Sequence, residues 1–103
     1  MEFINLTPHA IVVTGGATHA PSGTIARVTA SFGPFDENGI TEQQFGDVEN
    51  LPAPAEDNIY IVSGMVLSAL KGTRSDVVAP ATGHPDVVRN DKGHIVSVPG
   101  FTR

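Results

Sequence analysis

The chain has 103 residues with eleven acids, six lysines and arginines, no cysteine and a formal net charge of −5 at pH 7. This length supports one domain, residues 1–103, with a single modest core, and the weakly acidic balance excludes a diffuse basic surface for nucleic acid polymers. The lack of cysteine excludes a disulfide framework and a thiolate zinc site. No run of eighteen apolar residues occurs, and Glu2 stands where a signal peptide would need basic residues, so we expect a soluble, unexported chain without membrane contact.

The first third of the chain predicts short strands separated by turns. Eleven glycines and eight prolines are spread along the whole sequence, which implies many short elements and disfavours a helical bundle. Residues 3–6 and 10–14 predict two short strands that form a first hairpin-like unit. Residues 24–32 alternate between a more apolar and a more polar face, and Arg27 lies on the polar one.

The middle of the chain changes character. Residues 33–57 carry seven of the eleven acids and no cation, and they predict one strand at about residues 40–48 followed by a surface loop. Residues 58–63, Asn-Ile-Tyr-Ile-Val-Ser, give the clearest signal for a buried strand.

The last third predicts the only helix and a closing hairpin. The helix extends from about Ser63, which can cap its N-terminus, to Gly72, which can close it. Residues 76–80 predict a short extended piece, and residues 87–98 a β-hairpin around the turn at residues 90–93. The expected fold class is therefore α+β, a mostly antiparallel sheet of short strands with one short helix and a C-terminal β-hairpin.

The sequence offers few candidates for catalysis. No histidine has another histidine two or four residues away; the four are His9, His19, His84 and His94. Ser63 follows a strand and precedes a helix, yet it lacks the glycine two residues before it that a nucleophile elbow requires, so capping explains it better. Glycine-rich phosphate-binding loops are also missing. We therefore expect no catalytic residue, no metal and no cofactor.

A few separate arginines are the best candidates for binding an anion. Arg27 is the only lysine or arginine in the first seventy residues, and no acid lies within eight residues of it. Arg74 and Arg89 have acids close in sequence, Asp76 and Asp91, which favour surface ion pairing for them. Arg27 is therefore the strongest candidate for contact with a small phosphate-bearing ligand.

Five segments, in order from Ile4 to Val98 and spread over nearly the whole chain, resemble a family of small phage proteins. They are Ile-Asn-Leu-Thr-Pro-His (4–9), Pro-Ser-Gly-Thr-Ile-Ala-Arg-Val (21–28), Phe-Gly-Asp-Val-Glu-Asn-Leu-Pro (45–52), Ile-Tyr-Ile-Val-Ser (59–63) and Val-Arg-Asn-Asp-Lys-Gly-His-Ile-Val (88–96). The chain is similar in these segments to the Thoeris anti-defence protein one family. Members of that family are sponges that trap the signal made by bacterial TIR-domain immune enzymes.

The resemblance implies binding without catalysis, in the cytoplasm of a bacterial host. Family members sequester glycocyclic ADP-ribose isomers in pockets between the protomers of a homo-oligomer, a dimer or a hexamer built as a trimer of dimers, and so starve the immune effector of its activator. The family uses one arginine of the Ser-Gly-Thr-x-Ala-Arg-Val strand and one of the terminal Val-Arg-Asn hairpin. In this sequence the two positions are Arg27 and Arg89.

One part of the family pattern is absent. Some members also hold the cyclic trinucleotides of CBASS immunity at separate sites, and the family commonly carries a longer middle segment with basic residues. This chain has a short acidic run at residues 33–44 instead. Binding of CBASS cyclic trinucleotides at a separate site stays open as a second expectation from the resemblance, although a site built on that segment would lack the family's basic residues.

Two arginines are too few for tight binding. Nanomolar affinity requires about −12 kcal/mol, whereas a charge-assisted hydrogen bond contributes roughly 1.5–3 kcal/mol. The further contacts expected are Thr7, His9, Tyr60, Ser63, Met65 and Arg74, although each of them also has a plausible structural role. Two alternatives to a sponge remain open: an enzyme that hydrolyses or rearranges a cyclic nucleotide, and a phage structural or accessory protein.

Overall fold

The computed structural model describes residues 2–103. Within that range the strands are β1 (Glu2–Asn5), β2 (Ile11–Val12), β3 (Thr18–His19), β4 (Arg27–Phe32), β5 (Gln43–Glu49), β6 (Asn58–Ile61), β7 (Val77–Pro80), β8 (Val88–Arg89), β9 (Ile95–Ser97) and β10 (Phe101–Thr102), and the helix is α1 (Gly64–Leu70). The expected fold class is confirmed, because short strands and one short helix make an α+β architecture in which antiparallel pairs predominate.

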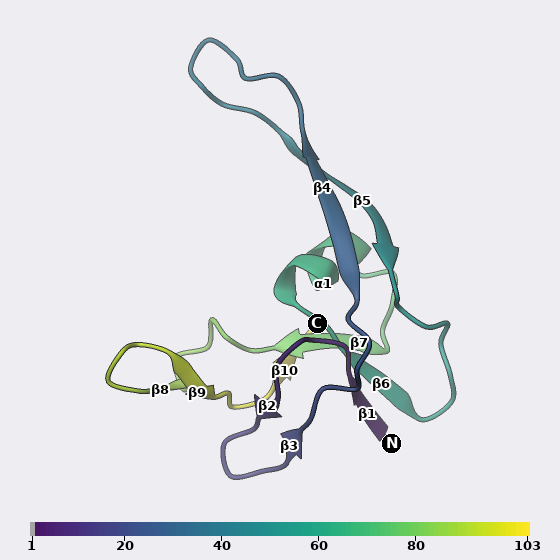
Figure 1. Cartoon of the computed structure of the whole chain (residues 1–103), viewed down its shortest axis with the longest axis vertical. Helices are drawn as coiled ribbons and strands as arrows, with labels where there is room; N and C mark the ends of the chain where they lie inside the picture. Colours follow the sequence, from purple (N-terminus) through teal and green to yellow (C-terminus); the bar gives the residue numbers. More distant parts are fainter. Residues whose placement is uncertain (1) are drawn as a thin grey trace.

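The central sheet has the strand order β1-β6-β7-β10. The pairs β1–β6 and β6–β7 are parallel, and β10 pairs antiparallel with β7. Neighbouring parallel strands require a crossover connection, and α1 provides it between β6 and β7 (Figure 1). The centre of the fold is thus a small β-α-β unit, and the antiparallel pairs lie at its edge or around it.

The core lies between one face of this sheet and α1. Its buried members come from the sheet, the helix and the segment before β4: Leu6, Ala26, Tyr60, Val62, Val66 and Val77. Half-buried apolar side chains close its margins, among them Val28, Val48 and Leu51 from the base of the β4–β5 pair. Because Ala26 and Val28 belong to this core, they hold the first residue of β4, Arg27, at its edge.

The ends of α1 follow from local sequence. Ser63 is extended, and its hydroxyl accepts a hydrogen bond from the backbone N–H of Val66 (3.3 Å). Lys71, rather than Gly72, is the first residue after the helix in the left-handed region, with φ +52°, and Gly72 follows with φ +75°. Among residues 2–103, no helix is long and apolar enough to cross a membrane.

The prediction that residues 3–6 and 10–14 pair as a hairpin-like unit is wrong. β1 instead pairs in parallel with β6, and β2 pairs with β3. The side chain of Asn5 explains the change of direction, because its amide donates to the carbonyl oxygens of both His9 and His19 (2.8 and 2.9 Å). These bonds fold the chain after β1 away from the sheet, and Gly15, with φ +70°, then allows the turn between β2 and β3.

The remaining strands differ from expectation mainly at their ends. The strand expected at residues 24–32 begins only at Arg27, and the one expected at residues 40–48 runs from Gln43 to Glu49. A β-bulge interrupts their pairing between Val28 and Ala30. The predicted C-terminal hairpin is confirmed as β8 and β9.

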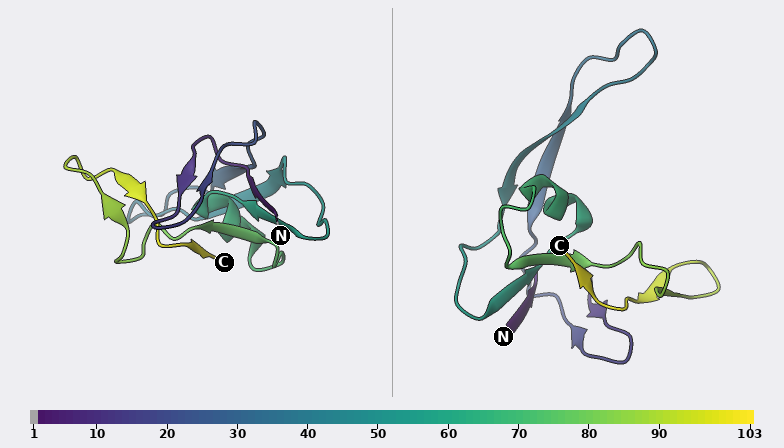
Figure 2. Two further views of the ribbon diagram at one scale, coloured as in Figure 1. Left: turned by 90° about the horizontal axis from the view of Figure 1, so that it is seen from below. Right: turned by 180° about the vertical axis from the view of Figure 1, so that it is seen from behind.

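Two hairpins project from the body. The pair β4–β5, with the loop that joins its strands, extends upward in Figure 1 well beyond the sheet and α1, and we call residues 27–49 the arm. The β8–β9 hairpin projects in another direction (Figure 2). The molecule is accordingly flat and open, with principal extents of 49 × 39 × 22 Å.

Candidate functional site

Arg27 lies where the arm leaves the core. The backbone N–H of its buried neighbour Ala26 donates to the carbonyl of Leu6 (3.0 Å), which fixes the start of β4 against the body. The Arg27 side chain points away from that core and is exposed. Within residues 2–103, it takes part in no hydrogen bond and in no ion pair within 4.0 Å.

An open hollow of about 380 Å³ surrounds Arg27. It is lined by two short stretches that face each other, residues 23–25 with Arg27 on one side, and Glu49 and Asn50 on the other. Arg27 and Glu49 are directly paired positions of the two antiparallel strands. Asn50 adopts φ +63° and its side-chain amide donates to the carbonyl of Ile25 (3.1 Å), so it ties the two sides of the hollow together.

The chemistry of this hollow suits a small, polar anion. A guanidinium offers five N–H donors in a planar fork that matches two phosphate oxygens at once. The Glu49 carboxylate accepts hydrogen bonds and therefore suits hydroxyl groups such as those of a ribose. Thr24 adds a hydroxyl at the open side. Sequence reasoning found Arg27 but missed Glu49 and Asn50, although an asparagine just after a strand is one of the few residues that tolerate the left-handed conformation.

Arg89 lies on the other projecting hairpin. Its guanidinium donates to the carbonyl of Gly93 (2.8 Å) across the turn between β8 and β9, and the side chain is otherwise exposed. Figures 1 and 2 place β8 apart from β4, so one protomer does not bring Arg27 and Arg89 together. A ligand that contacts both arginines would need one of them from a second protomer.

Thr7 and His9 belong to the network around Asn5. Thr7 is buried, its backbone N–H donates to the Asn5 side-chain oxygen (2.9 Å), and its hydroxyl lies 2.6 Å from that oxygen and 2.9 Å from the His9 carbonyl oxygen. The His9 side chain is exposed. Thr7 thus uses its polar groups within the chain, whereas the imidazole of His9 is accessible.

The residues expected around the start of α1 have three different environments. Tyr60 is only 3% exposed, lies in the core, and donates its hydroxyl to the Ala53 carbonyl (3.4 Å). Ser63 caps the helix. Met65 is 51% exposed. Of the three, Ser63 and Met65 are exposed and accessible to a ligand, whereas Tyr60 is buried.

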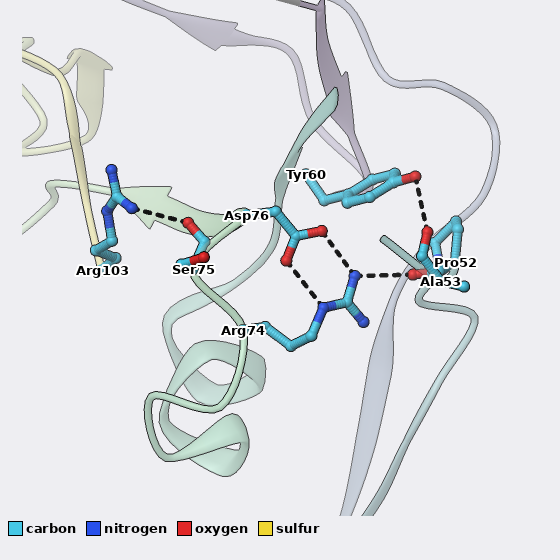
Figure 3. A network of polar contacts seen from close by, with 7 residues as sticks. All are labelled: Pro52, Ala53, Tyr60, Arg74, Ser75, Asp76 and Arg103. Atoms are coloured by element: carbon cyan, nitrogen blue, oxygen red, sulfur yellow. Dashed lines mark hydrogen bonds and ion pairs between the residues drawn. The ribbon is translucent and has the colours of Figure 1, made fainter. Parts of the chain in front are cut away.

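Arg74 is engaged in a structural network (Figure 3). Its Nε and one terminal nitrogen donate to the two carboxylate oxygens of Asp76, both at 2.9 Å, and that nitrogen also donates to the Pro52 carbonyl (3.0 Å). The hydrogen bonds from Arg74 hold the pKa of Asp76 below its usual range despite partial desolvation, and the same bonds raise the pKa of Arg74. Arg74 also lines a larger open cavity of about 1040 Å³ between β5 and α1.

The described residues contain no cluster of three or more histidine, aspartate or glutamate side chains that could hold a metal ion. Comparison of the chain with protein-family profiles, with curated proteins and with solved structures finds no match.

Proposed function

We propose that this protein is a phage anti-defence sponge that binds cyclic ADP-ribose isomers, in particular glycocyclic ADP-ribose, and sequesters them without degrading them. The main support for the proposal is the environment of the Arg27 side chain. It is an exposed guanidinium in an open hollow, with no ion-pair partner within residues 2–103. The other side chains of the hollow supply hydroxyl and carboxylate groups rather than a second cation.

The ligand matches this set of groups. A cyclic ADP-ribose isomer carries two phosphate charges, two riboses and an adenine. The Arg27 guanidinium would bind the phosphates, and Glu49 and Thr24 would accept or donate hydrogen bonds to ribose hydroxyls. Asn50 would keep the two sides of the hollow at a fixed separation. The hollow would then lose little conformational entropy when the ligand binds.

A single hollow is too small a site for tight capture. The binding groups of one protomer fall short of about −12 kcal/mol for nanomolar affinity, and a charge-assisted hydrogen bond contributes only roughly 1.5–3 kcal/mol. The proposed active form is therefore a homo-oligomer in which a second protomer, through Arg89 and the exposed side chains of His9 and Met65, closes the hollow. The proposed place of action is the cytoplasm of the infected bacterium.

Calorimetry of the purified protein with glycocyclic ADP-ribose tests this proposal. The wild type is expected to bind in the nanomolar to low micromolar range, and Arg27→Ala to lose at least about tenfold in affinity, equivalent to 1.4 kcal/mol. Lys71→Ala is a matched control, because this exposed cation lies after α1, outside both the Arg27 hollow and the β8–β9 hairpin. Wild-type affinity in a folded Arg27→Ala protein would refute the site.

A further inference from the structure

Arg27 and Glu49 face each other at the base of the arm without forming an ion pair. They are directly paired positions of the antiparallel strands β4 and β5. Side chains at such positions lie on the same face of the strand pair, with their Cβ atoms about 5 Å apart. Both side chains are exposed, and within residues 2–103 neither takes part in an ion pair. The guanidinium and the carboxylate are therefore neighbours that both remain accessible to a ligand.

These two side chains supply the charge of the hollow around Arg27. Among the residues that the structure describes, the other members of its lining are uncharged: Gly23, Thr24, Ile25 and Asn50. The next pair along the strands, Val28 and Val48, turns to the opposite face and packs against the core. The register of the strands thus places one positive and one negative group side by side at the same opening.

The backbone that carries Glu49 is held on both sides. Val48 before it packs against the core, and the Asn50 side chain after it donates to the Ile25 carbonyl (3.1 Å). Neither contact uses the Glu49 side chain, which takes part in no hydrogen bond or ion pair within residues 2–103. Its carboxylate is therefore positioned beside Arg27 with both oxygens able to accept hydrogen bonds from a ligand.

A carboxylate beside a guanidinium discriminates between two kinds of phosphate ligand. Its two oxygens accept hydrogen bonds from hydroxyl groups, and such bonds are strong because the acceptor is charged. An acidic residue binds the ribose hydroxyl of dinucleotides in the same way, whereas a phosphate at that position requires an arginine. A bare phosphate ion brings negative charge and acceptors, so the guanidinium attracts it and the carboxylate repels it. A phosphate joined to a ribose gains from both groups.

We propose that Glu49 is the specificity-determining residue of this hollow. It favours ligands in which a phosphate is joined to a ribose with free hydroxyls, and it rejects phosphate ions that lack such hydroxyls. The inference rests on the proposed function, since it concerns the same hollow, and it adds the class of ligand that the hollow excludes. With Arg27 alone, the hollow would accept any small polyphosphate. The carboxylate weakens that general attraction and provides selectivity through repulsion of the wrong ligand.

Two ligands measured on Glu49→Gln test this inference. Glycocyclic ADP-ribose is titrated directly, and inorganic pyrophosphate, the probe without a ribose, is measured by its displacement of bound glycocyclic ADP-ribose. Glu49→Gln keeps the size of the side chain but removes its charge. We therefore expect glycocyclic ADP-ribose to bind about three- to thirtyfold more weakly, and pyrophosphate to bind more tightly. Selectivity, the Kd of pyrophosphate divided by that of glycocyclic ADP-ribose, should fall by at least about fivefold.

Two further variants separate the carboxylate from other effects. Glu37→Gln is a matched control, because it makes the same chemical change at an exposed residue of the loop between β4 and β5, outside the lining of the hollow. It should keep the selectivity of the wild type. Glu49→Asp keeps the negative charge and should bind pyrophosphate as weakly as the wild type does. Circular dichroism checks that each variant is folded.

The outcomes distinguish this inference from the proposed function. Opposite changes for the two ligands cannot come from local unfolding, which would weaken both. If the wild type binds glycocyclic ADP-ribose but the selectivity of Glu49→Gln falls by less than about fivefold, or pyrophosphate displaces no ligand from that variant, the inference is overturned and the proposed function stands. A wild type that does not bind glycocyclic ADP-ribose would contradict the proposed function and this inference with it.

Discussion

Arg74 and Asp76 form a bidentate ion pair, with both nitrogen-to-oxygen distances at 2.9 Å and both side chains 19% exposed. The same guanidinium reaches the Pro52 carbonyl, so the pair fastens the loop before β6 to the segment that leads into β7. The neighbouring Tyr60 hydroxyl, bonded to Ala53, supports the same loop (Figure 3). This arginine therefore contributes to folding, whereas the Arg27 side chain is exposed and has no ion-pair partner within residues 2–103.

The first prediction concerns the stability that this pair provides. Arg74→Met keeps much of the aliphatic stem but leaves the Asp76 carboxylate without its donors, and we expect the free energy of unfolding to fall by about 1–3 kcal/mol. Urea denaturation at pH 7 measures it. Lys92→Met, at an exposed cation with no described side-chain partner, should change it by less than about 0.5 kcal/mol. Equal effects of the two changes would contradict a structural role for Arg74.

The second prediction is a pH dependence. Because hydrogen bonds from Arg74 lower the pKa of Asp76 in the folded state, the unfolded chain binds a proton at a higher pH than the folded one. The stabilisation is therefore present above about pH 4, the ordinary range of an aspartate, and is lost as the pH falls through the lower pKa of the folded state. Unfolding curves from pH 7 to 2 should show this loss, and Arg74→Met should show a smaller one. If the unfolding free energy of both proteins fell equally with pH, other carboxylates would be the cause of the loss.

The third prediction concerns the bulge in the arm. A side chain at Gly46 would place its Cβ 2.5 Å from the Thr29 hydroxyl oxygen, at the point where the strand register shifts. Gly46→Ala should therefore cost about 1–3 kcal/mol of stability. Gly83→Ala, with no atom within 4 Å of the added carbon, is expected to be neutral. Adding Thr29→Ala to Gly46→Ala should recover most of the loss, and a double variant as unstable as the single one would show that backbone strain is responsible.

The fourth prediction separates charge from geometry at the ligand. Arg27→Lys keeps the positive charge but replaces the planar fork by a point charge, so we expect weaker affinity for glycocyclic ADP-ribose than in the wild type and stronger affinity than in Arg27→Ala. All three proteins should unfold within about 0.5 kcal/mol of one another, since the Arg27 side chain is exposed. Full affinity in Arg27→Lys would mean that the site requires only a charge.

Arg89→Ala provides a contrast within the same experiment. This arginine donates to the Gly93 carbonyl across its turn, so its loss should weaken both ligand binding and the order of the β8–β9 hairpin. Arg89→Lys should restore part of the binding. Wild-type affinity in a folded Arg89→Ala protein would show that the second protomer's hairpin does not contribute to the site.

Local signals made part of the fold predictable. The helix and the C-terminal hairpin carry their own stop and turn residues, and Asn90 indeed organises its turn by accepting from the N–H groups of Lys92 and His94. The parallel pairing of β1 with β6 could not be foreseen in the same way, because the paired residues, such as Glu2 and Asn58, lie far apart in the sequence. One available signal was missed: two apolar runs joined by a helix are typical of a β-α-β unit.

The candidate site was predictable to a similar degree. The alternation of residues 24–32 placed Arg27 on an exposed face, and the isolation of its charge in the sequence agrees with the absence of a described ion pair. The residues opposite it depend on the register between β4 and β5, which a bulge shifts. The internal roles of Thr7 and Tyr60 depend on burial, which a single sequence does not reveal.

The central claim is that the protein holds its ligand intact. Purified protein in molar excess is incubated with glycocyclic ADP-ribose, free ligand is measured after filtration, and the protein is then denatured and the released ligand measured again by chromatography. We expect near-complete depletion followed by full recovery of the unchanged ligand. Arg27→Ala should deplete less ligand than the wild type at equal protein concentration and should also return it intact. Persistent loss after denaturation would identify an enzyme that consumes the nucleotide, and no depletion at all would contradict binding itself.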